Sequence, residues 1–281
     1  MRVINSAAQT QKYLNAARRR GRTIGFVPTM GALHEGHLSL IRRSKKENDI
    51  TVLSIFVNPL QFGPKEDFSI YPREKKKDVL LAKKENIDII TYPSVKEIYP
   101  ERFLTYVDVN WMNATLCGAL RPGHFRGVTT VVCKLLNLVG PDRLYLGQKD
   151  AQQAAVIRQM VRDLNIPVRV TVCPTVREPD GLAMSSRNAY LSRRQRAQAT
   201  VLYRALTTAR AQRRDRLTPG MLTKKLHRII TQNSSGKIDY IACVHPETLE
   251  PVQRLRGAVL VALAVKFGKA RLIDNMLIRF P

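Results

Sequence analysis

The sequence contains no run of about 18 consecutive apolar residues, the length that a membrane-spanning helix needs. Its first residues, 1–6, also lack the apolar segment of a secretory signal peptide. These two absences argue against a membrane or secreted protein. We therefore expect a protein of the cytoplasm that has no membrane partner.

Cysteine is scarce, and no C-x-x-C pair occurs. The four cysteines, Cys117, Cys133, Cys173 and Cys243, lie far apart along the chain. This spacing fits neither a disulfide framework nor a structural zinc site. It is typical of reduced, buried thiols in a cytoplasmic protein.

Acidic residues are few: 22 Asp and Glu face 47 Lys and Arg, which gives a net charge of +25. The excess is not confined to one tail or patch, because residues 1–176 carry 27 basic and 15 acidic side chains and residues 177–281 carry 20 and 7. Most basic side chains fall on helix-like segments such as 18–20, 75–77 and 193–194. No signature of an RRM, KH, zinc-finger or helix-turn-helix module is present. The pattern favours solvated helix faces and a general attraction for anions over specific nucleic-acid binding.

Apolar strand patterns alternate with helix patterns over the first 173 residues, which is typical of βαβ units and a parallel sheet. The spacing predicts strands at 23–27, 50–57, 87–90, 143–146 and 168–172, with a possible edge strand at 104–109. It predicts helices at 5–20, 38–44, 73–86, 124–139 and 151–164. Polar loops follow the strands, so we expect them at the carboxyl edge of the sheet, where such sheets bind ligands.

The pattern changes after Pro174, where a segment punctuated by Pro and Gly precedes helical patterns at 193–211 and 219–232. Strand-like runs follow at 238–244, 258–265 and 273–279. We therefore predict an α/β fold with a Rossmann-like nucleotide-binding domain over residues 1–176. A smaller α+β C-terminal domain, expected to act as a lid, would cover residues 177–281.

Two glycines and two histidines lie where the first predicted strand of the sheet turns into a helix, in residues 29–37. Backbone N–H groups and the helix dipole make such a junction favourable for phosphate. His34 and His37 are three residues apart, so both can lie on the first helical turn. An ordinary turn with one capping histidine remains the alternative. A zinc site is the weaker hypothesis, because metalloprotease histidines are spaced by four.

A second donor-rich loop contains two serines and an arginine at residues 184–187. Alone it is typical of a surface loop. Together with the histidine turn it resembles the two-part ATP signature of the class I synthetase and nucleotidyltransferase superfamily, in which an H-x-G-H turn and a K-M-S-K-S-type loop grip the triphosphate.

Five blocks of the sequence resemble the pantoate–β-alanine ligase family more specifically, and they occur in the family's order within residues 23–191. The blocks are residues 28–37, 56–62, 124–128, 147–153 and 180–188. The resemblance implies condensation of pantoate with β-alanine, driven by cleavage of ATP to AMP and pyrophosphate with Mg²⁺. It also implies a homodimer.

The resemblance also implies roles for individual residues. His37 would be the proton donor, and His34, Lys149, Ser185, Ser186 and Arg187 would act on the phosphates. Pantoate would contact Gln61 and Gln153, with Asn58 close by. No protein ligand of the metal is predicted. The residues expected to bind ATP are Met30, Gly31, Ala32, Leu33, His34, Glu35, Gly36, His37, Gly147, Gln148, Lys149, Asp150, Val176, Met184, Ser185, Ser186 and Arg187.

Two other functions stay open at this point. A nucleotidyltransferase of the same superfamily would share the H-x-G-H turn and release a dinucleotide-like product. A nucleic-acid-binding module would account for the charge without ATP chemistry.

Overall fold

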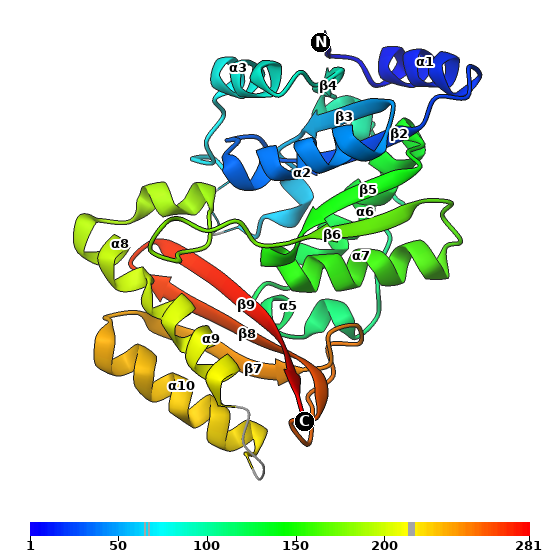
Figure 1. Cartoon of the computed structure of the whole chain (residues 1–281). Coiled ribbons are helices and arrows are strands. Elements are labelled where there is room, and N and C mark those ends of the chain that lie inside the picture. Colours follow the sequence, from blue (N-terminus) through cyan, green and yellow to red (C-terminus); the bar gives the residue numbers. More distant parts are fainter. Residues whose placement is uncertain (65, 67, 213–216) are drawn as a thin grey trace. The chain divides into compact units, whose positions relative to one another are not determined.

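The computed structural model describes residues 1–64, 66, 68–212 and 217–281. This part of the chain forms two compact units (Figure 1). The first comprises residues 1–147 and 156–173, and the second comprises residues 148–155 and 174–281. The boundary that we expected after residue 176, and a lid role for the C-terminal part, stay predictions.

The first unit is built on a six-stranded parallel sheet with the strand order β1-β4-β3-β2-β5-β6. The strands are β1 (Arg2–Ile4), β2 (Ile24–Thr29), β3 (Ile50–Ile55), β4 (Ile89–Thr91), β5 (Arg143–Gly147) and β6 (Arg169–Cys173). The α-helices are α1 (Ala7–Arg18), α2 (Glu35–Glu47), α3 (Lys75–Lys84), α4 (Val95–Ile98), α5 (Cys117–Leu120), α6 (His124–Val139) and α7 (Ala151–Asp163), of which α7 begins among the residues of the second unit. Short 3₁₀ turns are η1 (Pro59–Gln61), η2 (Met112–Ala114) and η3 (Gln148–Asp150). The predicted Rossmann-like sheet is confirmed.

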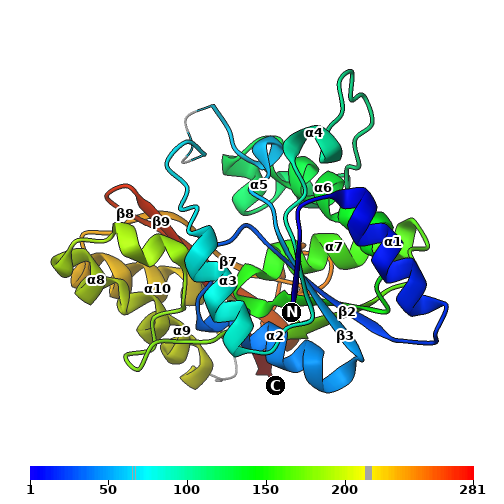
Figure 2. The ribbon, with the colours of Figure 1, turned by 90° about the horizontal axis from the view of Figure 1, so that it is seen from above.

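Helices cover the sheet because its strands are apolar on both sides. Leu38 and Ile41 of α2 and Ala82 of α3 share a buried cluster with Val27 and Leu53 of the sheet. Figure 2 shows α2 and α3 on one side of the sheet and α1 and α6 on the other. Such double burial explains why the strands read as continuous apolar runs.

The strand order reverses between β2 and β5, which are neighbours in the sheet. Open parallel sheets bind ligands beyond the carboxyl ends of the strands at such a reversal. β2 ends at Thr29, directly before the histidine turn, and β5 ends at Gly147, directly before Gln148. The fold therefore places the start of two predicted ATP blocks at the expected edge.

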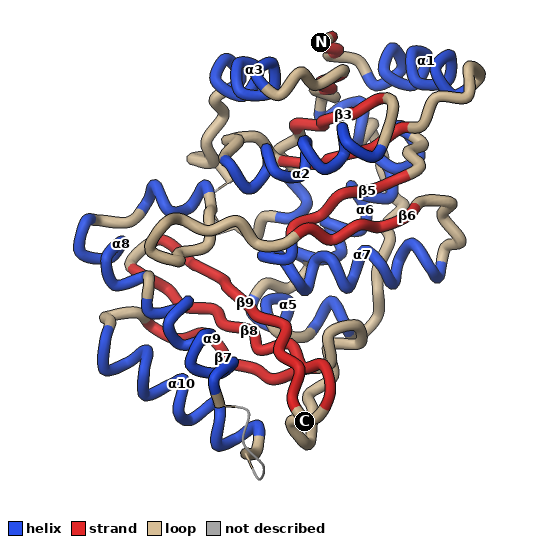
Figure 3. Tube along the Cα trace, in the orientation of Figure 1, coloured by secondary structure: helices blue, strands red, loops and turns tan. Residues whose placement is uncertain are grey.

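The second unit contains a three-stranded antiparallel sheet in the order β7-β8-β9 (Figure 3). Its elements are η4 (Ser186–Tyr190), α8 (Arg193–Ala199), α9 (Val201–Ala211), α10 (Pro219–Asn233), β7 (Lys237–Val244), β8 (Gly257–Phe267) and β9 (Ala270–Phe280). Leu202 and Leu206 of α9 and Leu226 of α10 pack against Val261 and Leu263 of β8. The predicted α+β arrangement is confirmed, although the expected helix 193–211 is two helices that meet at Thr200.

The possible edge strand at 104–109 was wrong. This segment joins no strand; its Val107 N–H donates to Thr130 Oγ1 at 3.0 Å, and Thr129 Oγ1 donates to the Val107 carbonyl at 2.6 Å. Side chains of α6 thus replace a strand partner. The edge strands are β6 and β1, and the three residues of β1 are too few for a periodic signal.

No helix within the described ranges is both long enough and apolar enough to cross a membrane.

Glu47 ties the end of α2 to β5. Its carboxylate accepts hydrogen bonds from Arg43 at 2.5 Å, from the Tyr145 hydroxyl at 2.8 Å and from Arg143 at 2.9 Å. The bonds from Arg43 and Tyr145 are the main reason that the pKa of Glu47 is lowered from 4.5 to about 2. A carboxyl with a lowered pKa stabilises the fold above its ordinary pKa and loses that effect as pH falls.

Replacement Glu47→Gln should therefore destabilise the protein at neutral pH, and the difference from wild type should shrink between pH 4.5 and about 2. Urea unfolding at a series of pH values measures this. The exposed Glu101→Gln is the matched control and should show no such trend. A stability difference for Glu47→Gln that is constant with pH would contradict the assigned contacts.

Candidate active site

A buried carboxylate holds the turn that follows β2. Asp78 of α3 is 1% exposed, and its two oxygens accept the backbone N–H groups of Ala32 at 3.1 Å and Leu33 at 2.7 Å. Burial raises the pKa of Asp78, while these two hydrogen bonds act in the opposite direction. A Cβ at Gly31, where φ is +86°, would lie 2.9 Å from Asp78 Oδ2, so the turn requires glycine there.

The two histidines of the turn form the N-terminus of α2. His34 is the N-cap: its Nδ1 accepts from the Gly36 N–H at 3.1 Å, and its own N–H donates to His37 Nδ1 at 3.4 Å. The ring centroids are 4.1 Å apart. A neutral imidazole that accepts at Nδ1 carries its proton on Nε2, so the proton of each ring lies on Nε2. A Cβ at Gly36 would lie 2.8 Å from His34 Cε1, so a larger residue there would displace the His34 ring.

Asn58 and Gln61 follow β3 and meet the same turn. Gln61 is 8% exposed; its Oε1 accepts from Asn58 Nδ2 at 3.1 Å, and its Nε2 donates to Met30 Sδ at 2.9 Å. Asn58 also donates to the Gly127 carbonyl at 3.0 Å and accepts from the Tyr99 hydroxyl at 2.7 Å. Asn58 therefore orients Gln61, whose N–H faces only a weak thioether acceptor among its described contacts.

A charged network that the sequence did not predict contacts the backbone carbonyl of Gln61. Arg121 forms an ion pair with Glu66 at 2.5 Å and donates to His124 Nε2 at 2.9 Å. Because Arg can only donate, His124 Nδ1 carries the proton and donates to the Gln61 carbonyl at 2.7 Å. Burial acts to raise the pKa of Glu66, but the Arg121 bond and charge hold it below its ordinary value. The blocks at 56–62 and 124–128 pointed to Gln61 and His124, but no sequence signal pointed to Arg121 or Glu66.

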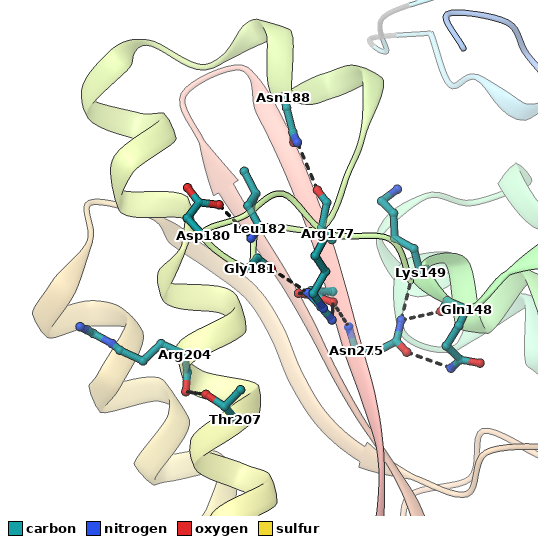
Figure 4. Close-up of polar contacts among 12 residues, drawn as sticks. Gln148, Lys149, Arg177, Asp180, Gly181, Leu182, Asn188, Arg204, Thr207 and Asn275 are labelled. Atoms are coloured by element: carbon teal, nitrogen blue, oxygen red, sulfur yellow. Dashed lines mark hydrogen bonds and ion pairs between the residues drawn. The ribbon is translucent and has the colours of Figure 1, made fainter. Parts of the chain in front are cut away.

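The predicted ATP block at 147–150 is divided between the units: Gly147 ends β5 in the first unit, and Gln148 to Asp150 belong to the second. Asn275 of β9 donates to the carbonyls of Gln148 and Lys149, both at 2.9 Å (Figure 4). Lys149 Nζ lies 3.5 Å from Asp150 Oδ1. Gln153 is partly buried on α7. Asn275 was not singled out from the sequence.

Hydrogen bonds hold both the start of the predicted serine loop and its 3₁₀ turn, in the same unit. The Met184 N–H donates to the Val176 carbonyl at 3.1 Å, which brings two predicted ATP residues together. The Arg187 N–H donates to Ser185 Oγ at 3.2 Å, so Ser185 caps the 3₁₀ turn that contains Ser186.

The structure thus groups the predicted residues into two sets. Residues Met30 to His37 lie with Asn58 and Gln61 in the first unit, and residues 148–153 lie in the same unit as Val176 and Met184–Arg187. Among the described residues, no group of three or more His, Cys, Asp or Glu side chains has the arrangement of a metal site.

Comparisons with known proteins show which family the chain resembles. A family model described as pantoate-beta-alanine ligase matches residues 2–277. The pantothenate synthetase of Caldicellulosiruptor saccharolyticus is 54% identical over 283 residues, covering 99% of each chain, and that of Thermotoga petrophila is 51% identical over 279 residues, covering 99% of this chain and 100% of the other. The structure of pantothenate synthetase from Thermus thermophilus is similar with a TM-score of 0.94 at 45% identity, with full coverage of both chains. That of pantoate-beta-alanine ligase from Francisella tularensis, complexed with beta-gamma ATP and beta-alanine, has a TM-score of 0.81 at 38% identity and covers 99% of this chain and 97% of the other.

The hydrogen bonds predict opposite tautomers for the histidines of the first unit. At a pH where the rings are neutral, His34 and His37 should carry the proton on Nε2 and His124 on Nδ1. Long-range ¹⁵N correlation spectra of histidine-labelled protein distinguish the two forms, with assignment by single His→Gln variants. A proton on Nδ1 of His34, or on Nε2 of His124, would contradict the geometry.

Proposed function

Because the chain belongs to the pantoate-beta-alanine ligase family, we propose that it activates pantoate as an acyl-adenylate at the turn after β2. The protein is an ATP-dependent ligase that condenses pantoate with β-alanine to form pantothenate. The observation that carries the adenylate step is the pair of histidines, His34 and His37, at the N-terminus of α2, held by a turn that Asp78 fixes.

In the proposed first step, a carboxylate oxygen of pantoate attacks the α-phosphorus of ATP and pyrophosphate leaves. Both partners are anionic, so donors and cations must offset the repulsion. His34 and His37 would donate Nε2–H to phosphate oxygens, and the N-terminus of α2 adds its positive potential. His37 is proposed as the proton donor to the departing group.

Gln61 and Gln153 are proposed to bind pantoate, with Asn58 holding Gln61. The support is that Gln61 Nε2 donates to Met30 Sδ, and a carboxylate or hydroxyl oxygen would be a better acceptor. A buried amide with a weak partner gains most from such an exchange. Neutral amides also orient the substrate without adding charge.

Lys149, Ser185, Ser186 and Arg187 are proposed to contact the phosphates, and Gly147, Gln148, Asp150, Val176 and Met184 the rest of the nucleotide. Lysine and arginine would neutralise charge that develops on pyrophosphate. The hydroxyls add donors, and neither Ser nor Cys needs to act as a nucleophile. In the second step the β-alanine amine attacks the acyl carbon and AMP leaves.

Mg²⁺ is proposed to arrive with ATP. The carboxylates in and beside the nucleotide blocks already have protein partners: Asp78 accepts two backbone N–H groups, Glu35 pairs with Arg42, and Asp150 lies 3.5 Å from Lys149 Nζ. This donor set fits an ion held mainly by phosphate oxygens and water, as Mg²⁺ commonly is. The ion would screen the triphosphate charge.

A homodimer in the cytoplasm is also part of the proposal, on the grounds of the family resemblance. Sedimentation equilibrium tests the dimer. The nucleotidyltransferase and the nucleic-acid module that the sequence left open are both set aside, because the family model covers residues 2–277 and describes a ligase.

The adenylate step predicts pantoate-dependent exchange of labelled pyrophosphate into ATP without β-alanine. The purified wild-type protein with Mg²⁺ is the sample, and omission of pantoate is the control. Absence of exchange, while pantothenate is still formed, would refute the adenylate route.

Replacement His37→Ala should lower the exchange rate by about 10²–10³, which is the scale of losing one key donor in the transition state. His227→Ala, at an exposed position of α10, is the matched control and should leave the rate unchanged. An unaltered rate in His37→Ala would remove His37 from the mechanism.

A further inference from the structure

Two neighbouring polar residues lie nearly buried in β9. Asp274 is 2% exposed and Asn275 is 5% exposed. Both belong to a strand that pairs with β8 along its whole length, from Phe280 to Ala270. Successive side chains of a strand point to opposite faces, so the pair can serve two different segments from one rigid position.

Asn275 is bonded to the turn that carries Lys149. Its Nδ2 donates to the carbonyls of Gln148 and Lys149, each at 2.9 Å, and its Oδ1 accepts from Gln148 Nε2 at 2.9 Å (Figure 4). Two hydrogen bonds from one buried amide thus fix the backbone of this turn, and the third holds the Gln148 side chain. The direction of the Lys149 side chain depends on that backbone.

Asp274 is bonded to the base of the serine loop. Its carboxylate forms two hydrogen bonds with Arg177, at 2.7 and 3.0 Å. Arg177 also donates to the Gly181 carbonyl at 3.0 Å, and its guanidinium lies 4.4 Å from the centre of the Tyr203 ring. The backbone of Arg177 pairs with Ala183, next to Met184. The loop therefore starts from a point that Asp274 fixes.

We propose that Asp274 and Asn275 are positioning residues of the ligase, which set Lys149 and the Met184–Arg187 loop from one strand of the second unit. The inference rests on the proposed phosphate roles of Lys149 and Arg187. Neither Asp274 nor Asn275 touches a substrate in this account. Groups that orient a ligand-contacting residue are most effective on rigid elements, and β9 is such an element.

Kinetics of Asn275→Ala and Asn275→Asp test the first half of the proposal. The aspartate keeps the shape but turns a donor into an oxygen that faces two carbonyls. Both variants should lower kcat/KM for ATP by about 10- to 100-fold, the range known for residues that orient the ligands of a metal site. The KM for β-alanine should not change. Arg279→Gln, at an exposed position of β9, is the control and should match wild type.

Double-variant cycles separate positioning from a general structural role. If Asn275 acts through Lys149, then Asn275→Ala should cost nothing further in a Lys149→Ala background. The same holds for Asp274→Asn in an Arg187→Ala background. Additive losses, wild-type kcat/KM for ATP in a folded Asn275 variant, or equal losses for all substrates would each overturn the proposal. Failure of the wild type to exchange pyrophosphate would refute instead the proposed function beneath it.

Discussion

The contact on which the first unit's site depends is the buried carboxylate of Asp78 with the N–H groups of Ala32 and Leu33. A turn with φ of +86° at Gly31 and +50° at Ala32 is unfavourable for most residues, and a buried carboxylate left without donors would be costly. The two hydrogen bonds stabilise the turn, and the turn supplies the donors that the buried carboxylate needs. The turn then delivers His34 to the N-cap of α2, where its ring lies over Gly36 and within 4.1 Å of His37. Phosphate-binding potential, donor direction and tautomer all follow from this one arrangement.

In each unit a side chain distant in sequence fixes the backbone of a polar loop. His124 donates to the Gln61 carbonyl in the first unit, and Asn275 donates to the carbonyls of Gln148 and Lys149 in the second. The loops begin where parallel strands end, and the strand order reverses between β2 and β5. In the proposed function, specific donors at fixed positions recognise the anionic nucleotide. The net charge of +25 adds a general attraction but no direction.

The periodicity of the sequence predicted the helices and strands, because these depend on neighbouring residues. Helix α6 begins and ends where its periodicity indicated, and β2, β3 and β5 coincide closely with apolar runs. The segment at 104–109 misled because its alternation is that of a strand, whereas Thr129 and Thr130 satisfy the Val107 backbone. The sequence indicated no role for Asp78, Arg121 or Asn275, because they contact residues far along the chain. Asp78 is 46 residues from Ala32, and Asn275 is 127 residues from Gln148. No periodicity encodes such pairs. The family motifs pointed to the loops and not to the side chains that hold them.

The central claim is that the turn after β2 directs a substrate carboxylate to the α-phosphorus of ATP. Pantoate labelled with ¹⁸O in its carboxylate tests it most directly, by mass spectrometry of the products of a single turnover. Attack at the α-phosphorus leaves one labelled oxygen bridging the acyl group and the phosphate. When the amine displaces AMP, that oxygen stays with phosphorus, so the account predicts AMP that carries one ¹⁸O. Label in inorganic phosphate or pyrophosphate, or unlabelled AMP, would contradict it.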